Sequence, residues 1–291
     1  MYPSRFDYLA PTSLAEAVAG LERGGDQARV IAGGQSLMRL MRFRYESPSH
    51  LVDLRHLRLG GIEETEGTLR VGAMTTDATL ETSPVIRRRY PLLADVARVI
   101  ADPLIRNLGT IGGSAAYAHP SGDWGPALLA ARASFATVGP DGPRLIPVDE
   151  FFVGSYCTAL GQAEILTGIN IPVAADGGGA YMKLHRKVGD FATVGVGVQL
   201  RVSADGTIQD CGIGMTGVAL SYVRASKAEE YLAGRHLDRD ALRRCGGIAS
   251  EETHPVKDAR GTSAYKREMV KVLCTHALEA AAARAGVPVE G

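Results

Sequence analysis

The first predicted element of this chain is an amphipathic helix near the N-terminus. Apolar residues recur there at the helical spacing of three or four, at Leu14, Ala17, Val18 and Leu21. Ser13 and Glu16 have the spacing of a capping box, in which each side chain binds a free main-chain N–H group. Gly24 and Gly25 are typical of a helix end. The pattern predicts a helix that begins after Ser13 and ends at these glycines.

The rest of the chain alternates between short apolar runs and longer helical patterns. Runs of strand character occupy residues 28–31, 68–73, 133–138, 144–148, 165–171, 193–202 and 207–218. Helical patterns occupy residues 83–88, 91–100, 124–131, 224–232, 239–245 and 263–284, the last with Ser263 as its cap. We therefore expect a protein that contains both strands and helices.

A turn-rich stretch at residues 172–179, which includes the glycine run 177–179, predicts a domain boundary. We expect one domain at residues 1–175 and a second at 180–284. The strand–loop–strand pattern at the start of the chain closes near residues 51–54. It predicts that the first domain has two lobes, at about 1–56 and 57–175.

Charge and hydropathy exclude several classes of protein. Lys plus Arg and Asp plus Glu both total 32, so no net charge favours binding to nucleic acid or to an anionic membrane. No apolar stretch has the length of a membrane span, and residues 1–7 lack the apolar core of a signal peptide. We expect a cytoplasmic protein, and its 291 residues suffice for two domains.

The cysteines and histidines do not indicate a metal site. The four cysteines are widely scattered, at Cys157, Cys211, Cys245 and Cys274. They form no C-x-x-C pair for zinc and no iron–sulfur run, so we expect buried, reduced thiols. The seven histidines are dispersed, and the sequence contains no H-E-x-x-H motif. Any metal chemistry that this protein serves is expected on another chain.

Two glycine pairs are the strongest candidates for a binding site. Gly33–Gly34 follows the predicted strand 28–31, and Gly112–Gly113 follows Thr110. Glycine pairs turn tightly, leave room for a ligand, and let successive N–H groups converge on an anion. Two such loops suit a ligand with two phosphates, although each pair alone is also typical of a simple tight turn. Neither has the spacing of a P-loop or of the Rossmann fingerprint.

The wider sequence resembles the flavoprotein, or medium, subunits of the molybdenum hydroxylases, the relatives of carbon monoxide dehydrogenase and xanthine dehydrogenase. The matching stretches lie in the family's order, at residues 31–37, 110–123, 164–167, 181–183 and 263–267. The resemblance implies an α+β fold: a two-lobed FAD-binding domain of the p-cresol methylhydroxylase type, then a smaller α+β C-terminal domain. The chain departs from the usual family residues at Ser114, Tyr117 and His119.

The resemblance also implies a set of FAD-binding residues. They are Ile31, Ala32, Gly33, Gly34, Gln35, Ser36, Leu37, Ala101, Thr110, Gly113, Ser114, Asp123, Ile165, Leu166 and Lys183. No catalytic acid or base and no metal ligand are expected on this chain. The FAD is expected to be non-covalent, because Gln35 stands beside the glycines where some members of the wider fold superfamily carry a linking histidine.

Several of these residues have a second interpretation. Asp123 fits either a contact to sugar or ribityl hydroxyls or the N-cap of the helix at 124–131. Lys183 fits either a cation at the flavin ring or a surface lysine whose stem lies on apolar surface. Tyr156 and Tyr181 fit either stacking on the ring or ordinary packing.

The function implied by the resemblance is electron transfer within a heterotrimer. A large subunit would oxidise the substrate at a molybdenum cofactor, and a small subunit with two [2Fe–2S] clusters would pass the electrons to FAD on this chain. The acceptor after FAD stays open between quinone, NAD, oxygen and other carriers. We expect a dimer of heterotrimers. The alternatives are a stand-alone flavin oxidoreductase and a scaffold subunit without flavin.

Overall fold

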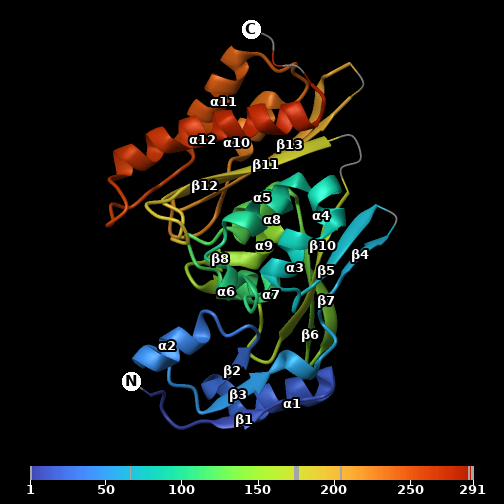
Figure 1. The fold of residues 1–291 in the computed structure, drawn as a ribbon, viewed down its shortest axis with the longest axis vertical. Helices are drawn as coiled ribbons and strands as arrows, with labels where there is room; N and C mark the ends of the chain where they lie inside the picture. Colours follow the sequence, from blue (N-terminus) through green and yellow to red (C-terminus); the bar gives the residue numbers. More distant parts are fainter. Residues whose placement is uncertain (1, 66, 174–176, 204, 288, 290–291) are drawn as a thin grey trace.

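The computed structural model describes residues 2–65, 67–173, 177–203, 205–287 and 289. Three parts follow one another along the longest axis of the molecule (Figure 1). We call them the N-terminal lobe (residues 2–56), the middle lobe (57–173) and the C-terminal domain (177–287). Each part is built around its own β-sheet.

The N-terminal lobe has a parallel sheet in the order β1–β3–β2. Its strands are β1 (Asp7–Leu9), β2 (Ala28–Ile31) and β3 (His50–Asp53), and its helices are α1 (Leu14–Gly24) and α2 (Leu37–Phe43), with 3₁₀ turns at Gly25–Gln27 and Leu54–His56. Ser13 caps α1 by accepting from the Glu16 N–H group, and Gly25 ends it at φ +52°. The predicted helix and its caps are confirmed.

The middle lobe has an antiparallel sheet in the order β4–β5–β10–β6–β7. Its strands are β4 (Ile62–Thr65), β5 (Thr68–Gly72), β6 (Ser134–Gly139), β7 (Gly142–Pro147) and β10 (Ile165–Pro172), beside a short pair, β8 (Phe152–Gly154) and β9 (Cys157–Thr158). Its helices are α3 (Asp77–Thr82), α4 (Pro84–Arg89), α5 (Pro91–Val99), α6 (Pro103–Arg106), α7 (Ile111–Tyr117), α8 (Trp124–Ala130) and α9 (Val148–Phe151). Trp124, Phe135 and Phe151 are fully buried in its core.

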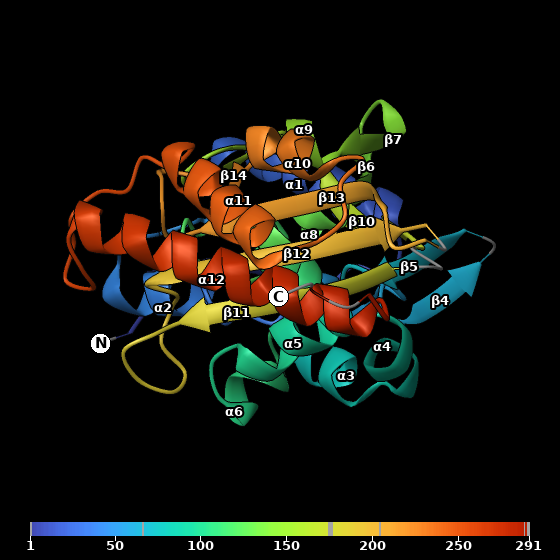
Figure 2. The same ribbon diagram turned by 90° about the horizontal axis from the view of Figure 1, so that it is seen from above.

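The C-terminal domain has an antiparallel sheet in the order β11–β12–β13–β14. Its strands are β11 (Gly177–Leu184), β12 (Val194–Val202), β13 (Ile208–Thr216) and β14 (Val223–Arg224), and its helices are α10 (Ser226–Leu232), α11 (Arg239–Glu251) and α12 (Ser263–Arg284). Seen from above, α11 and α12 lie across the outer face of the sheet (Figure 2). The opposite face packs on α5 and α8 of the middle lobe.

Glycines let the sheet approach the backbone of α8 closely. A Cβ atom at Gly212 would overlap the carbonyl oxygen of Ala130, and one at Gly214 would overlap that of Pro126. A residue with a side chain at either position would push β13 away from α8. These contacts fix the C-terminal domain on one helix of the middle lobe.

The structure corrects several predictions at glycines and at element ends. Gly112 and Gly113 lie in the first turn of α7, not in a loop. Gly177–Gly179, predicted as a turn, begins strand β11, and the remainder of the predicted boundary, residues 174–176, lies outside the described residues. Thr262, not Ser263, caps α12. Helix α11 continues past Cys245 to Glu251. Of the four cysteines, which were expected to be buried, Cys157 is exposed and Cys211, Cys245 and Cys274 are buried.

Candidate functional site

An open pocket of about 1090 Å³ lies between the N-terminal and middle lobes. The loop from β2 to α2, helix α2 itself and the segment from α6 to α7 form its walls. It is lined by Tyr2, Pro3, Ile31, Ala32, Gly33, Gly34, Gln35, Met38, Arg39, Arg42, Arg55, Met74, Thr76, Asn107, Leu108 and Thr110. Several predicted site residues therefore share this one pocket.

The loop after β2 offers main-chain donors to this pocket. Within the described part of the chain, the N–H groups of Gly33, Gly34, Gln35 and Ser36 donate no hydrogen bond. Gly34 has a φ of +70°, and a Cβ atom at Gly33 would overlap the carbonyl oxygen of Leu108. Both glycines are needed for this loop shape. A row of free N–H groups is a good binding site for an anion such as a phosphate.

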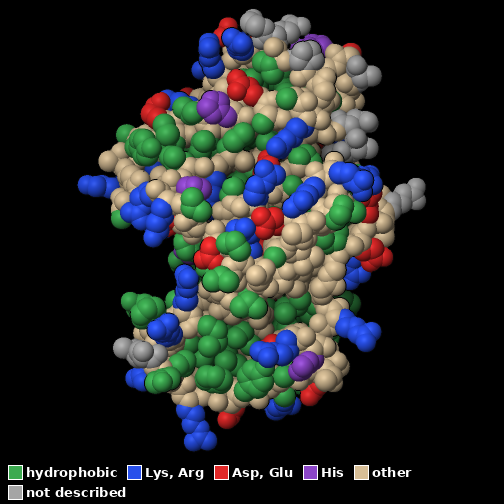
Figure 3. All heavy atoms as spheres, in the orientation of Figure 1, with side chains coloured by type: hydrophobic (Ala, Val, Ile, Leu, Met, Phe, Trp, Pro, Cys, Tyr) green, Lys and Arg blue, Asp and Glu red, His purple; other side chains and the backbone are tan. Residues whose placement is uncertain are grey.

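Two arginines of α2 add positive charge to the same pocket. Arg39 and Arg42 are three residues apart, so they lie on one face of the helix, and both line the pocket. Neither forms an ion pair within the part of the chain that the structure describes, whereas Arg55 is paired with Asp53 at 2.7 Å. Sequence reasoning missed Arg39 and Arg42, because helix α2, which places them on one face, was not predicted either. Figure 3 shows blue Lys and Arg side chains around green hydrophobic ones on this lobe.

The second glycine motif does not offer free amides. Thr110 caps α7, and its hydroxyl accepts from the Gly113 N–H group at 3.1 Å. The N–H groups of Ile111, Gly112 and Ser114 donate to the carbonyl oxygens of Thr75, Ala73 and Thr110. The motif therefore holds α7 against the middle sheet and places Thr110 at the pocket wall. The prediction that its amides converge on an anion is not supported by this geometry.

A second group of predicted residues meets where the middle lobe contacts β11. The Asp123 carboxylate accepts from the Lys183 ammonium group at 2.8 Å and from the Tyr181 hydroxyl at 2.8 Å. The Lys183 side chain is 2% exposed and that of Asp123 is 6% exposed. Burial raises the pKa of Asp123, while the Lys183 charge lowers it. Removing either charge of such a pair leaves the other buried without a partner, which is strongly destabilising.

This contact rules out the second interpretation of both charged residues. Asp123 has helical φ and ψ angles and forms no side-chain capping bond to α8. Lys183 is not a surface lysine, because its ammonium group also donates to the Val99 carbonyl oxygen at 3.1 Å. Tyr181 is 5% exposed, so its ring packs in the core of the middle lobe. The residues predicted separately form one polar cluster between two parts of the molecule.

The remaining predicted residues lie at different depths. Ala101 has a φ of +42°, which is uncommon for a residue with a side chain and is often found near functional sites. Ile165 and Leu166 of β10 are buried and face opposite sides of the sheet. Ile165 packs with α1, and Leu166 packs in the middle-lobe core. Ser114 and Gly113 are half-buried on α7.

A group of aromatic rings joins the middle lobe to the connection between β11 and β12, to which Phe191 belongs. Tyr117 and Tyr156 have ring centroids 5.2 Å apart, and the His119 ring stacks on Phe191 at 3.9 Å. Tyr156 is 54% exposed, with a φ of +55°. Burial lowers the pKa of His119 to about 4, and its Nδ1 atom accepts from the Ser121 N–H group. Tyr156, predicted as a candidate for stacking, therefore belongs to a larger group of rings.

Replacing the buried Asp77 with asparagine is expected to stabilise the protein at neutral pH. Asp77 is 3% exposed and accepts from the Trp124 indole at 2.9 Å, and burial raises its pKa from 3.8 to about 6. The protonated Asp77 carboxyl group contributes fully to the stability of the fold below its unfolded pKa. This contribution is lost as the pH rises through the folded pKa. Asn retains an acceptor for Trp124. At about 1.4 kcal/mol per pKa unit, we expect a gain of at most about 3 kcal/mol, less the cost of burying the asparagine N–H groups.

The gain should appear as a higher melting temperature at pH 8 that shrinks as the pH falls toward 4. Calorimetry of Asp77→Asn against the unchanged protein across this pH range tests the expectation. An increase that is independent of pH would show that the cause is not the ionisation of Asp77.

The structure offers no metal centre on the residues it describes. Among them, no group of three or more His, Cys, Asp or Glu side chains is placed to hold a metal ion. None of the helices in the described ranges combines the length and the apolar character that crossing a bilayer requires.

Comparison with known proteins identifies the family. The model for the "FAD binding domain in molybdopterin dehydrogenase" matches residues 4–174, and that for the "CO dehydrogenase flavoprotein C-terminal domain" matches residues 179–281. The carbon monoxide dehydrogenase medium chain of Hydrogenophaga pseudoflava is 41% identical over 98% of this chain and 99% of its own length. The glyceraldehyde dehydrogenase medium chain of Sulfolobus acidocaldarius is 32% identical over 96% of this chain and 99% of its own length.

A solved structure agrees with the sequence relatives. Carbon monoxide dehydrogenase from Hydrogenophaga pseudoflava, in a form that lacks the Mo-pyranopterin moiety of its cofactor, superposes with a TM-score of 0.94 at 42% identity. The match covers 98% of this chain and 99% of that one. The expected fold, a two-lobed FAD-binding domain followed by an α+β domain, is confirmed. This chain belongs to the family of FAD-binding medium chains of the molybdopterin dehydrogenases.

Proposed function

We propose that this chain carries electrons from two [2Fe–2S] clusters of a small subunit to an external acceptor through FAD. A large molybdopterin-type subunit oxidises the substrate. The observation that carries the proposal is the pocket between the lobes, where free N–H groups and two unpaired arginines meet. FAD is a flavin joined to adenosine through a diphosphate, and when bound it supplies the redox chemistry of its flavin ring.

The pocket fits the diphosphate part of FAD. The N–H groups of Gly33, Gly34, Gln35 and Ser36 would bind the phosphates, with Arg39 and Arg42 as counter-charges. Ile31, Ala32 and Thr110 line this pocket and would form its walls. Leu37, Gly113 and Ser114 do not line it, but they follow these residues on α2 and α7 and are proposed to lie near the cofactor as well. The loop contains no linking histidine: Gln35 follows the glycines, and its side-chain amide donates to the Gly33 carbonyl oxygen. The FAD is therefore proposed to be non-covalent.

The rest of the cofactor would extend toward the contact between the middle lobe and β11. Ala101, Ile165 or Leu166, and Lys183 are proposed to surround it. Lys183 is a buried cation at this contact, and its position is fixed by Asp123 and the Val99 carbonyl oxygen. Asp123 is proposed to act on the cofactor in two ways. It holds Lys183 in place, and its carboxylate oxygens accept hydrogen bonds from sugar or ribityl hydroxyl groups.

The domain limits are also proposed from these findings. We place the FAD-binding domain at 1–175, with lobes at about 1–56 and 57–175, and the C-terminal domain at 180–284. The separate sheets of the described residues support this division. The ranges of the two family models, 4–174 and 179–281, support it as well.

The substrate is proposed to be determined by the large subunit. One relative is named as a medium chain for carbon monoxide and another as one for glyceraldehyde, although both align over nearly all of this chain. Similar medium chains therefore accompany different substrates. We propose a dimer of heterotrimers located in the cytoplasm. A stand-alone flavin oxidoreductase and a scaffold without flavin are not favoured by the family match.

Purification of the chain from its own host, with an affinity tag, tests this proposal. Native mass spectrometry should show two dissimilar partner subunits, and acid precipitation should release all the yellow colour as FAD. Flavin that stays in the protein pellet would contradict the non-covalent link. An active homo-oligomer, FMN in the supernatant, or a colourless complex would contradict the proposed function itself.

A further inference from the structure

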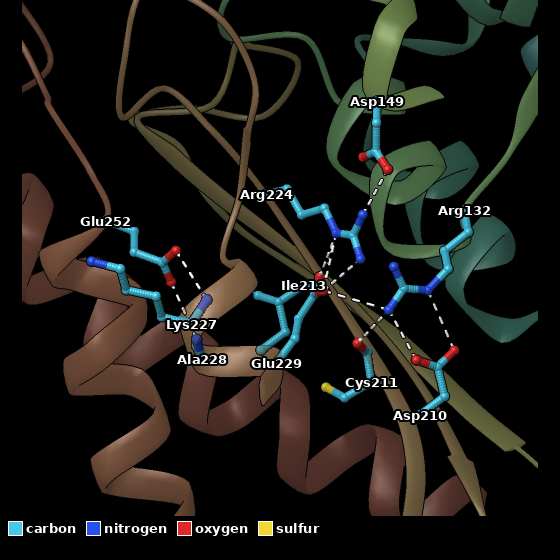
Figure 4. A network of polar contacts seen from close by, with 10 residues as sticks. All are labelled: Arg132, Asp149, Asp210, Cys211, Ile213, Arg224, Lys227, Ala228, Glu229 and Glu252. Atoms are coloured by element: carbon cyan, nitrogen blue, oxygen red, sulfur yellow. Dashed lines mark hydrogen bonds and ion pairs between the residues drawn. The ribbon is translucent and has the colours of Figure 1, made fainter. Parts of the chain in front are cut away.

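A network of ion pairs connects the middle lobe to the C-terminal domain beyond the end of α8 (Figure 4). Arg132 follows α8 and has a φ of +51°, in the left-handed region that few residues with side chains adopt. Its guanidinium group donates to both oxygens of Asp210, at 2.9 and 3.3 Å, and to the Cys211 carbonyl oxygen at 3.1 Å. The backbone of the middle lobe thus accepts an unfavourable conformation where its side chain contacts β13.

Glu229 of α10 lies at the centre of this network. It is 6% exposed and accepts from the Ile213 N–H group at 2.8 Å and from Arg224 at 2.8 to 3.1 Å. Arg132 approaches it from the middle lobe at 3.5 Å. Arg224 also donates to Asp149 of α9 at 2.7 Å, so the network crosses between the two parts of the molecule twice.

The residues at the two ends of α8 therefore contact two different strands of the C-terminal sheet, β11 and β13. Asp123, just before α8, contacts Tyr181 and Lys183 on β11. Arg132, just after α8, contacts Asp210 on β13, and the two strands lie on either side of β12. A rotation of the sheet about one contact is opposed by the other.

We propose that Arg132 is a positioning residue that determines how long FAD stays bound. The proposal rests on the proposed function, because it takes the cofactor to lie beside Lys183. With Arg132 in place, the C-terminal domain is held at both sides and Lys183 stays on Asp123. Without Arg132, the hold on β13 is weaker and rests on the Arg224–Asp149 pair and on the packing of Gly212 and Gly214 against α8. The domain then moves more often and the cofactor leaves faster, although Arg132 itself does not touch it.

The test compares Arg132→Met and Arg132→Lys with a matched control in the purified complex. The control is Arg144→Met, since Arg144 also pairs with a buried carboxylate, Glu164, but both belong to the middle lobe. The first readout is the FAD dissociation rate, followed by flavin fluorescence after dilution. We expect it to rise at least tenfold in Arg132→Met, by less in Arg132→Lys, and not in Arg144→Met.

A second readout does not depend on FAD. Hydrogen exchange in β11 and β13 should be faster in Arg132→Met than in Arg144→Met, because the sheet leaves α8 more often. If Arg132→Met does not assemble, Asp210→Ala removes both acceptors of this contact from the other side, at a residue whose side chain is 41% exposed.

Equal FAD dissociation rates in the Arg132 and Arg144 variants would overturn the positioning role and leave only a general effect on stability. A dissociation rate that rises without faster exchange in β11 and β13 would overturn the proposed domain movement. An unaltered complex that contains no FAD would instead contradict the proposed function, so the two failures are distinguishable.

Discussion

Replacing Arg39 and Arg42 together with glutamine is expected to weaken FAD binding by about 100-fold or more. Both arginines line the pocket and have no acidic partner among the described residues, so their charge is available to a ligand. A hydrogen bond to a charged group contributes about 1.5–3 kcal/mol, and each 1.4 kcal/mol is a factor of ten in affinity. Glutamine is shorter than arginine but stays polar, and it removes the positive charge and the guanidinium donors.

The measurement is a fluorescence titration of the deflavinated complex with FAD and with FMN. FAD binding to the unchanged complex should weaken as salt rises, and the double variant should lose most of that dependence. Its preference for FAD over FMN should also fall, since the second phosphate loses its counter-charge. Arg44→Gln is the matched control, because Arg44 ends the same helix but does not line the pocket.

An unchanged FAD dissociation constant in the double variant would place the diphosphate elsewhere. Loss of FAD binding in Arg44→Gln as well would show that the cause is damage to α2 and not the missing charges. Only a loss confined to the double variant supports the arginines as FAD contacts.

Local features of the fold could be predicted from the sequence because the signals are themselves local. The helix α1 has its cap at Ser13, its apolar face and its terminal glycines within a dozen or so residues, and all were found. The strand β2 and the long helix α12 were predicted for the same reason. These elements are specified by the residues within them.

The glycine motifs show where local reasoning fails. A glycine pair is typical of a turn, yet Gly112 and Gly113 lie in a helix because Thr110 caps it and its N–H groups bond to residues near 73–75. Likewise, the run at Gly177 begins a strand, where a Cβ atom at Gly178 would overlap the Ala281 carbonyl oxygen of α12 and one at Gly179 would crowd Leu92 of α5. In both cases a distant segment determines the conformation, and a sequence pattern does not show which segment that is.

The candidate site could be predicted residue by residue but not as an arrangement. Asp123 and Lys183 were each selected through the family resemblance, and each had a plausible second role. Their contact joins residues 60 positions apart from two parts of the molecule. Periodicity and caps carry no information about such a pair. Arg39 and Arg42 were missed because a helix with exposed arginines is ordinary until the neighbouring pocket is known.

Lys183→Met is expected to lower the free energy of unfolding by about 3–5 kcal/mol, the usual cost of leaving one member of a buried ion pair alone. The Lys183 side chain is 2% exposed, so no water replaces the missing ammonium group beside Asp123. Methionine has a similar length and fills the space. The loss should be measured by denaturant unfolding, monitored by circular dichroism.

A double-mutant cycle separates the ion pair from the packing. Asp123→Asn leaves an acceptor for the Tyr181 hydroxyl but removes the charge that faces Lys183. The double variant Asp123→Asn with Lys183→Met removes both charges, so it should be clearly more stable than Lys183→Met alone. Because the pair joins the middle lobe to β11, the single variants should also release FAD faster. If the two single losses simply add in the double variant, Asp123 and Lys183 do not act as a pair in solution, and the proposed fixing of Lys183 by Asp123 is wrong.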